Sequence, residues 1–266
     1  MNRSIQRLVA LGIPNPVRTR GFLLHYDTRI AAHVRTELAV GIFEDEMRSL
    51  IETLLHPGMT MIDLGANIGY FSLVGARSVG SSGRVYAFEP DPVTFAILDK
   101  NVRASGLHDV IRTINKAVTD TEGTVLLFRY AVDSGMNNLY RGEGGLDTGV
   151  MVSTTSLDSF FEKDGWAQVH LIKVDIEGAE TAAFAGMHRL VGRNPSLVMI
   201  VEFNPWCLRN AGVTHHDFFD SLMRLGFKRI HVVEARLEAL QIPGDIPRLN
   251  DIWSAKGQVN LLCRLG

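Results

Sequence analysis

Residues 59–71 constrain the fold of this chain more than any other segment. A short apolar run ends at Asp63, and Gly65, Asn67 and Gly69 follow at two-residue spacing before an amphipathic helical pattern begins. This order is typical of a strand, a tight turn and a helix, the first unit of a nucleotide-binding α/β fold. Its glycines permit backbone conformations and close approaches that a Cβ atom would block.

A regular alternation of strand and helix patterns follows this unit. We expect strands at 59–63, 85–88, 110–114, 123–128, 150–152, 168–175, 197–203, 228–233 and 259–263, and helices at 43–55, 69–79, 92–104, 178–191 and 214–225. Thr155 with Asp158, and Thr214 with Asp217, have the spacing of capping boxes. Alternating strands and helices form parallel sheets covered on both faces. We therefore predict a Rossmann-like, doubly wound α/β fold with a mostly parallel seven-stranded sheet, whose last strands form an antiparallel edge.

The first 42 residues precede this alternation, so we separate a segment 1–42 from a domain 43–266. We expect a helix within the first 20 residues, a linker broken by prolines, and short strands at 22–26 and 30–34. The simplest interpretation of the basic N-terminal helix is packing on the domain surface. A lid, a membrane-surface contact or a homodimer contact stay open as alternatives.

Composition excludes several classes of protein. The 266 residues carry a net charge of −2, so no general field favours nucleic acid. The two cysteines, Cys207 and Cys263, form no CxxC motif, which argues against a disulfide scaffold and fits a reducing cytosol. No apolar run approaches the ~20 residues that span a bilayer. We expect a cytoplasmic protein without a nucleic-acid partner or a transmembrane segment.

In open α/β sheets, ligands bind beyond the carboxyl ends of the strands. Six acids fall at or just beyond these ends, which is too many for a site that holds a pyrophosphate: Asp63, Glu89, Asp91, Asp175, Glu177 and Glu202. The dinucleotide fingerprint also fails, because Asn67 replaces its middle glycine and Ser72 its last one. Glu89, 20 residues after Gly69, is placed to accept both ribose hydroxyls of an adenosyl group. A cationic adenosyl ligand, S-adenosylmethionine, fits these features.

Four segments together are similar to a known family: 62–72, 87–91, 155–158 and 172–180. They resemble the FkbM family of class I S-adenosylmethionine-dependent methyltransferases, over roughly residues 43–232. The resemblance implies transfer of a methyl group to a hydroxyl oxygen of a small molecule, often a sugar or a polyketide-derived natural product. It names no particular acceptor.

The predicted cofactor-binding residues lie at the ends of the first three strands of the alternation: Asp63, Gly65, Asn67, Gly69, Glu89 and Asn115. Some of them have simpler interpretations. Asp63 is equally suited to bind backbone N–H groups of the turn, and Asn67 to cap the next helix. Asp91 is better suited to an N-cap than to a ligand contact.

The catalytic candidates are Asp175, Glu177 and Glu202. An alcohol loses its proton as the new C–O bond forms, and a carboxylate with a raised pKa can accept that proton. Asp175 is the first choice, although Glu177 is also explained by its place at a helix N-terminus. Lys173 shares a strand face with Asp175 and is expected to pair with it. Mg²⁺ held by these acids is an alternative that we do not favour.

The glycine-rich stretch 129–152 is a candidate acceptor loop or a plain solvated hairpin. Its polar side chains are Asp133, Asn137, Asn138, Tyr140, Arg141 and Glu143. The run 215–217 (His-His-Asp) lies on the first turn of a capped helix, where adjacent side chains diverge by about 100°. It therefore predicts no metal site, and His231 is the one histidine with a weak case as a base.

Two other functions stay open. The first is an NAD-dependent oxidoreductase, which Asn67 and Ser72 in the turn disfavour. The second is a non-catalytic methyltransferase fold that serves as a binding or scaffold subunit, because cofactor binding does not prove turnover.

Overall fold

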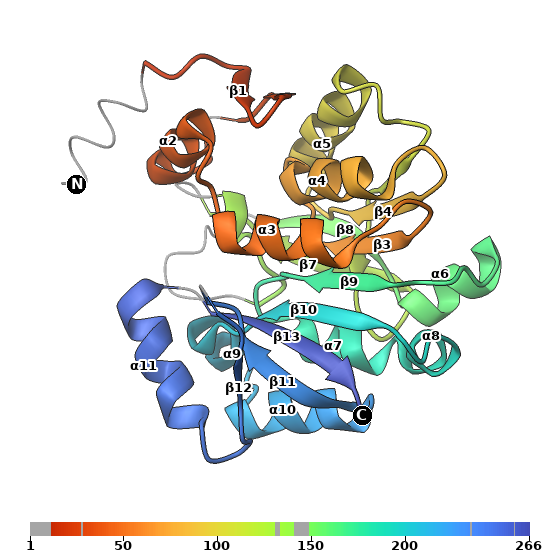
Figure 1. Ribbon diagram of the computed structural model, residues 1–266, viewed down its shortest axis with the longest axis vertical. Coiled ribbons are helices and arrows are strands. Elements are labelled where there is room, and N and C mark those ends of the chain that lie inside the picture. Colours follow the sequence, from red (N-terminus) through yellow and green to blue (C-terminus); the bar gives the residue numbers. More distant parts are fainter. Residues whose placement is uncertain (1–11, 28, 131–133, 141–148, 235, 258) are drawn as a thin grey trace.

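An eight-stranded sheet organises the chain (Figure 1). The computed structural model describes residues 12–27, 29–130, 134–140, 149–234, 236–257 and 259–266. Across the sheet the strands are β12 (Glu238–Ala239), β11 (Phe227–Val232), β13 (Asn260–Leu265), β10 (Val198–Glu202), β9 (Leu171–Val174), β3 (Thr60–Leu64), β4 (Arg84–Phe88) and β5 (Ile111–Ile114).

Five neighbouring strands, from β10 to β5, run parallel, and β13 runs antiparallel to both β10 and β11. The sheet therefore has eight strands instead of the expected seven, whereas the expected antiparallel edge of the last strands is confirmed, with β12, β11 and β13 at one side of the sheet. The chain between β11 and β13 is not a simple loop, because it contains helix α11 (Ile246–Lys256). This longer connection places β13 inside the sheet, between β10 and β11.

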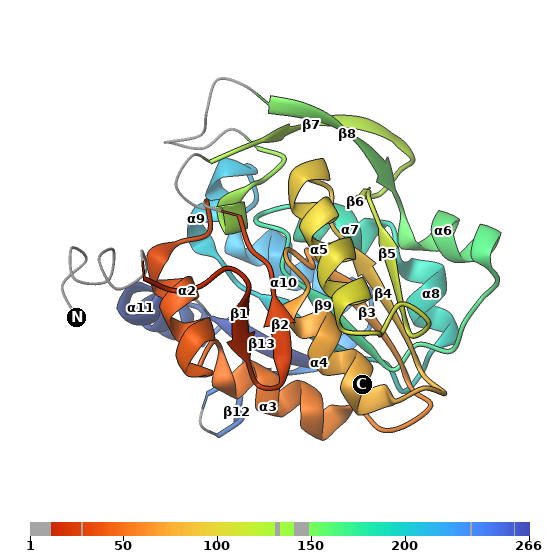
Figure 2. The ribbon, with the colours of Figure 1, turned by 90° about the horizontal axis from the view of Figure 1, so that it is seen from above.

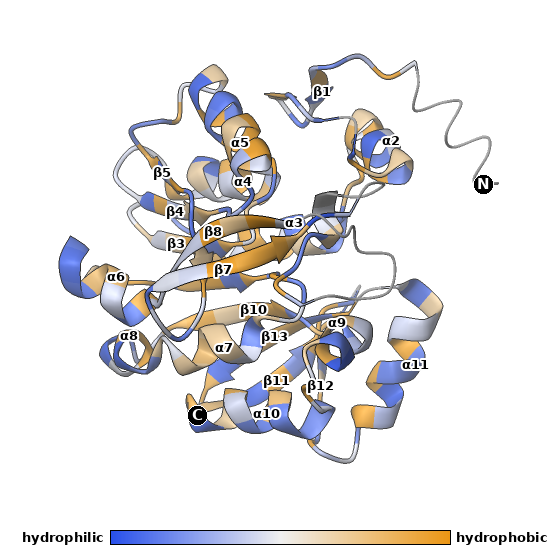
Figure 3. Cartoon of the chain, turned by 180° about the vertical axis from the view of Figure 1, so that it is seen from behind, coloured by the Kyte–Doolittle hydropathy of each residue, from blue (hydrophilic) through white to orange (hydrophobic). Residues whose placement is uncertain are grey.

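Helices cover both faces of the sheet (Figure 1). Strand β3 is buried along its whole length, and its alternate residues enter two different cores. Met61 packs with the first group of helices, whereas Ile62 and Leu64 pack with the second. The first group is α3 (Asp45–Leu54), α4 (Tyr70–Val79) and α5 (Pro92–Ala104), and the second is α6 (Leu157–Asp164), α7 (Glu180–Ala185), α8 (His188–Arg193) and α10 (His215–Arg224). Figure 3 shows the largely hydrophobic central strands between these layers.

The expected helix 178–191 is two helices, α7 and α8. They part at Gly186, where an added Cβ atom would lie 2.3 Å from the carbonyl oxygen of Thr119. The capping box expected at Thr155 is also wrong by one residue, because Ser156 caps α6. The carboxylate of Asp158 instead accepts hydrogen bonds from the backbone N–H groups of Arg189 and Leu190, in the first turn of α8. The capping box of Thr214 with Asp217 is confirmed at the start of α10.

The described part of the N-terminal segment packs into the same core as α4 and α5. Strands β1 (Val17–Thr19) and β2 (Phe22–Leu24) form an antiparallel hairpin. The strand expected at 30–34 is wrong, since helix α2 (Ala32–Val40) lies there and ends at Gly41 in the left-handed conformation. Strand β1 lies where the proline-broken linker was expected, and the helix expected before this linker falls on residues 1–11, which lie outside the described part.

The last residues of the glycine-rich stretch, 149–152, belong to a second, three-stranded sheet. Its strands are β6 (Ala117–Val118), β7 (Gly123–Phe128) and β8 (Gly149–Thr155), with β8 between the other two. Figure 2 shows β7 and β8 as a separate layer beside the helices. A single 3₁₀ turn, Ser134–Met136, follows β7, and the helix α9 (Pro205–Asn210) follows β10. Within the described residues, no helix is both long and apolar enough to cross a membrane.

A buried charge cluster lies at the centre of the main sheet. Lys173 on β9 is 2% exposed, and it is the register partner of the fully buried Asp63 on β3. Its Nζ lies 2.9 Å from Oδ2 of Asp175 and 3.8 Å from Oδ1 of Asp63. Ser72 of α4 donates a hydrogen bond of 2.6 Å to Asp63, and Nζ lies 5.1 Å from the centre of the Phe71 ring. The cluster therefore links β3, β9 and α4, and the expected pairing of Lys173 with Asp175 is confirmed.

Replacing Lys173 with methionine should destabilise the fold strongly. The change keeps most of the side-chain volume but leaves Asp63 buried without its counter-charge, which costs about 3–5 kcal/mol in comparable pairs. Urea unfolding followed by circular dichroism measures the loss. Lys228→Met is the control, since Lys228 is exposed on β11, and it should change stability by less than about 0.5 kcal/mol. Equal stability of the two variants would contradict this account.

Candidate cofactor and active site

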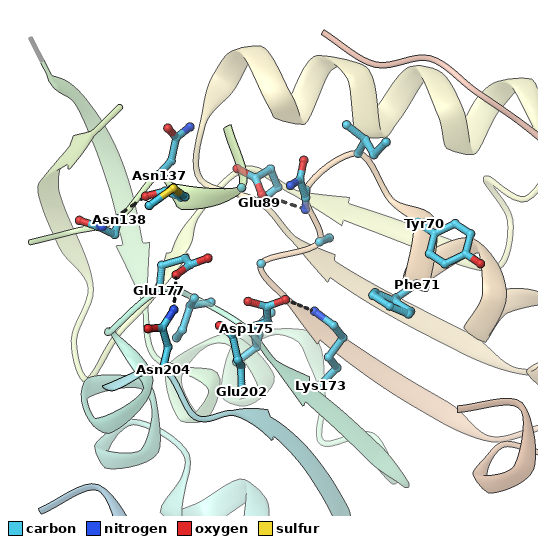
Figure 4. Close-up of a pocket in the computed structure, with 18 of the residues that line it drawn as sticks. Tyr70, Phe71, Glu89, Asn137, Asn138, Lys173, Asp175, Glu177, Glu202 and Asn204 are labelled. Carbon is cyan, nitrogen blue, oxygen red and sulfur yellow. Dashed lines mark hydrogen bonds and ion pairs between the residues drawn. The ribbon is translucent and has the colours of Figure 1, made fainter. Parts of the chain in front are cut away.

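A cavity of about 710 Å³ lies at the carboxyl ends of β3, β4, β9 and β10. The β3–α4 turn, the end of β4, the segment after β9 and the residues around Asn137 form much of its wall (Figure 4). Residues from α2 to the start of α3 and from α11 complete the wall. Its position matches the expected ligand site of an open α/β sheet.

The β3–α4 turn is shaped by its glycines. Gly65 has a φ of +76°, and an added Cβ atom would lie 1.8 Å from the backbone oxygen of Asp175. Gly69 has a φ of +93° and is the N-cap of α4, so Asn67 does not cap this helix. Asn67 also has a positive φ, +50°. Its buried Oδ1 has no hydrogen-bond partner in the described part of the chain, which is the state of an acceptor group that a ligand would satisfy.

Glu89 lies directly against this turn. Its Oε2 accepts a hydrogen bond from the backbone N–H of Asn67 (3.0 Å), and its Oε1 accepts one from that of Asp91 (2.9 Å). The residue is only 7% exposed, and burial raises the pKa of its carboxyl group to about 8. The structure thus brings together Gly65, Asn67 and Glu89, three of the predicted cofactor-binding residues, in the wall of one cavity.

Three predicted cofactor-binding residues are not among the described residues that line the cavity: Asp63, Gly69 and Asn115. Asp63 bonds Ser72 and faces Lys173. Asn115 donates from Nδ2 to the backbone oxygens of Glu89 and Pro90, at 2.8 and 2.9 Å. Direct contact of these residues with a ligand stays a prediction.

Asp91 is the N-cap of α5, as predicted, and it also connects remote segments. Its Oδ1 accepts from the backbone N–H of Val93. Arg129 donates to both carboxylate oxygens at 3.0 and 2.6 Å, Asn137 donates at 2.9 Å, and Arg29 lies 3.4 Å away. These donors hold the pKa of the Asp91 carboxyl below its usual value, against the effect of burial. The N-terminal segment and the stretch after β7 are thereby attached next to Glu89.

The three catalytic candidates converge on the other side of the cavity (Figure 4). One carboxylate oxygen from each of Asp175, Glu177 and Glu202 lies within 4.8 Å of the others. Oε2 of Glu177 accepts hydrogen bonds from the Cys207 thiol (2.9 Å) and from Nδ2 of Asn204 (3.4 Å). Such a group of hard oxygen donors could also hold a divalent cation.

Glu202 lies in a strongly perturbed environment. Its Oε2 is buried, and no hydrogen-bond partner for it occurs among the residues that the structure describes. Burial raises the pKa of its carboxyl group well above the usual value, and the negative charges of Asp175 and Glu177 raise it further. A carboxylate in this state accepts a proton more readily than an exposed one.

The cavity also contains residues that the sequence analysis missed. Trp206 follows the N-cap of α9, and Trp253 lies on α11, a helix that was not expected. Three sequence signals for α11 were available: Asp245 before Ile246, apolar residues at helical spacing, and Gly257 at the end. Glu44, just before α3, was missed because its acidic neighbours Asp45 and Glu46 fit an ordinary helix N-terminus.

The candidate acceptor stretch contributes to the cavity in part. Asn137 and Asn138 line it. Tyr140 is described but is not among the lining residues, and Asp133, Arg141 and Glu143 lie outside the described residues. Among the histidines, His231 on β11 is likewise not in the described lining. Asp217 of the run 215–217 is used by the capping box.

Replacing Gly65 with alanine should destabilise the chain more than the same change at Gly106. Both glycines have a positive φ, but a Cβ at Gly106 would meet no atom within 4 Å. Gly106→Ala should therefore cost about 1–2 kcal/mol from backbone strain alone. Gly65→Ala should cost a further ~1–3 kcal/mol from the overlap with Asp175. Thermal unfolding of the two variants measures the difference, and equal losses would contradict the packing described for the turn.

Comparison with known proteins identifies the family. The family described as the methyltransferase FkbM domain matches residues 63–229. The 31-O-demethyl-FK506 methyltransferase FkbM of Streptomyces tacrolimicus is 30% identical over 159 residues, 50% of this chain and 61% of that protein. Methyltransferase sdnD of Sordaria araneosa is 26% identical over 155 residues, 48% and 60% of the two chains. This chain thus spans about three-fifths of the length of these curated relatives.

Among solved structures, methyltransferase FkbM from Methylobacillus flagellatus KT has 14% sequence identity and a TM-score of 0.48, over 90% of this chain and 56% of that one. The family match covers more than half of the present sequence and includes the β3–α4 turn, Glu89 and the three converging carboxylates. The resemblance found in the sequence motifs is confirmed, and the chain belongs to the FkbM methyltransferase family.

Proposed function

We propose that this chain is an S-adenosylmethionine-dependent O-methyltransferase that acts on a hydroxyl group of a small molecule, such as a sugar or another natural product. One observation carries the proposal. The buried carboxylate of Glu89 lies beside the glycine turn, inside a cavity that also holds a second group of carboxylates. The first feature suits an adenosyl ribose, and the second suits the removal of a proton from an acceptor.

The residues present fit this cofactor. The cavity of about 710 Å³ has the size of a small-molecule site. Gly65 allows the turn to pack against the backbone of Asp175, and Asn67 offers an unpartnered acceptor there within the described structure. Glu89 would hold the ribose, and the turn would bind along the rest of the ligand.

The charge of the cavity also supports a cationic cofactor. Acidic residues outnumber basic ones in the described lining: Glu37, Glu44, Glu46, Glu89, Asp175, Glu177 and Glu202 against Lys116, Lys173 and Lys256. Lys173 and Lys256 are paired with Asp175 and Glu234. A sulfonium and an ammonium group are favoured in such a field, whereas an acceptor with a phosphate or a carboxylate is repelled. We therefore expect a neutral or cationic acceptor.

For methyl transfer, the bound cofactor would supply an activated methyl group on its sulfonium. The chain aligns the acceptor hydroxyl with it, and this positioning alone lowers the barrier by several kcal/mol. Asp175 is held by Lys173 at 2.9 Å and is suited to orient the hydroxyl. Glu202, whose pKa is raised, is suited to accept the hydroxyl proton. This assignment replaces Asp175, the first choice from sequence, with Glu202 as the base.

A divalent cation is the alternative use of the same three carboxylates. Mg²⁺ bound by Asp175, Glu177 and Glu202 would lower the pKa of the acceptor hydroxyl and orient it. Activity that disappears on chelation and returns with Mg²⁺ would support this route over a carboxylate base.

The names of the relatives support an oxygen acceptor. The Streptomyces tacrolimicus protein is named for 31-O-demethyl-FK506. Because the present chain covers only part of that protein, the acceptor class is carried over as a proposal. A scaffold without turnover and an NAD-dependent enzyme are the competing functions.

Calorimetry with S-adenosylhomocysteine and with NAD tests the cofactor. We expect saturable binding of S-adenosylhomocysteine and none of NAD. The reverse would favour the oxidoreductase. A screen of hydroxylated sugars, glycosides and polyketides for methyl transfer then separates an enzyme from a scaffold, because only an enzyme consumes S-adenosylmethionine in the presence of an acceptor.

Glu202→Gln should lower kcat about 10²–10⁴-fold, the range for loss of a general base. Its affinity for S-adenosylhomocysteine should stay within about twofold of wild type, since we assign the ribose to Glu89. Initial rates and calorimetry on the same preparation measure both. Asp175→Asn is the companion variant. Full turnover by Glu202→Gln together with inactivity of Asp175→Asn would return the base to Asp175.

A further inference from the structure

Glu44 lines the cavity but has no evident structural task. It immediately precedes α3, and its side chain makes no capping hydrogen bond to this helix. Within the part of the chain that the structure describes, its backbone oxygen accepts a hydrogen bond from the N–H of Arg48. The first turn of α3 already carries Asp45 and Glu46, so favourable charge at the helix N-terminus does not depend on Glu44.

The backbone of Glu44 is held in an unusual conformation. Its φ is +41°, in the left-handed region that side chains other than glycine rarely adopt. Phe43, the preceding residue, is fixed by ring contacts with Tyr70 (5.4 Å between centroids) and Phe71 (6.1 Å) of α4. This anchoring holds Glu44 at the cavity wall, on the side where Lys173 and Asp175 lie.

The charge of Glu44 is incompletely balanced within the described structure. Burial and the negative charge of Asp175 raise the pKa of its carboxyl group to about 7, and Lys173 acts against them. The Lys173 ammonium is already hydrogen-bonded to Asp175 at 2.9 Å. No hydrogen bond or ion pair joins the Glu44 carboxylate to a described residue. A partly buried carboxylate of this kind is stabilised by a cation that can donate hydrogen bonds to it.

The shape of S-adenosylmethionine indicates which of its cations would reach Glu44. The ribose and the amino-acid end lie on opposite sides of the sulfur, joined to it by short carbon chains. Glu89 and Asn67 form the proposed ribose site. Glu44 lies in the part of the cavity near Asp175, whose charge acts on it. A ligand held at Glu89 and extended past Gly65 therefore brings its amino-acid end toward Lys173 and Glu44.

We propose that Glu44 binds the α-ammonium group of the methionine moiety of S-adenosylmethionine, as the acceptor of a charge-assisted hydrogen bond. The proposal rests on the proposed function, since it concerns the same cofactor. It makes the segment before α3 part of the cofactor site.

Two ligands separate this role from a merely structural one. S-adenosylhomocysteine carries the amino-acid end, whereas 5′-methylthioadenosine keeps the adenosine and the sulfur but lacks that end. Calorimetry with both ligands on wild type and on Glu44→Gln should show about a tenfold to hundredfold loss of affinity for S-adenosylhomocysteine in the variant, the usual effect of losing a hydrogen bond between charged groups. Affinity for 5′-methylthioadenosine should stay within twofold, which also reports that the variant is folded.

Asp220→Asn is the matched control for net charge, because Asp220 is exposed on α10. It should leave the affinity for both ligands unchanged. Equal affinity of wild type and Glu44→Gln for S-adenosylhomocysteine would overturn the role of Glu44 and leave the proposed function intact. An equal loss for both ligands would overturn it as well, in favour of a structural role. If wild type binds neither ligand, the proposed function fails, and the role of Glu44 fails with it.

Discussion

The buried ammonium group of Lys173 is the interaction on which the rest of the site depends. A charge at 2% exposure in the middle of a parallel sheet is tolerated only with counter-charges at hand. Asp63 and Asp175 supply them, and Ser72 satisfies a further oxygen of Asp63. The cluster thereby joins two strands and a helix below the cavity. The hydrogen bond from Lys173 also fixes the carboxylate of Asp175, which lines the cavity.

A second buried acid, Asp91, organises the cover of the cavity. Its donors come from the segment before α2, from the end of β7 and from the stretch that follows, through Arg29, Arg129 and Asn137. Its own backbone N–H binds Glu89. The N-terminal segment and the second sheet are therefore attached to the cavity wall at the predicted ribose site. This connection explains why residues outside the central alternation of strands and helices line the cavity.

Sequence patterns predicted elements best where apolar spacing and turn residues agreed, as in β3, α4, β4 and α5. They failed where tertiary contacts decided. The helix at 178–191 divides because Gly186 packs against the backbone of Thr119. The segment expected as a strand at 30–34 instead leads into helix α2 at Ala32, and Val34 and Leu38 of this helix pack into the same core. Residues of α11 had helical spacing, but the prolines and glycine before them favoured a loop.

By itself, the sequence determined the strand–turn–helix unit, the acids at the strand ends and the family, because each depends on spacing within a short segment. Period-two alternation alone also placed Lys173 and Asp175 on one face of a strand. Only the tertiary structure decided that Asp175, Glu177 and Glu202 converge, that Asp91 collects three remote donors, and that Glu44 faces the same cavity. These contacts join positions far apart along the chain. No local pattern encodes them, since they arise from the order of the strands and the packing of covering segments.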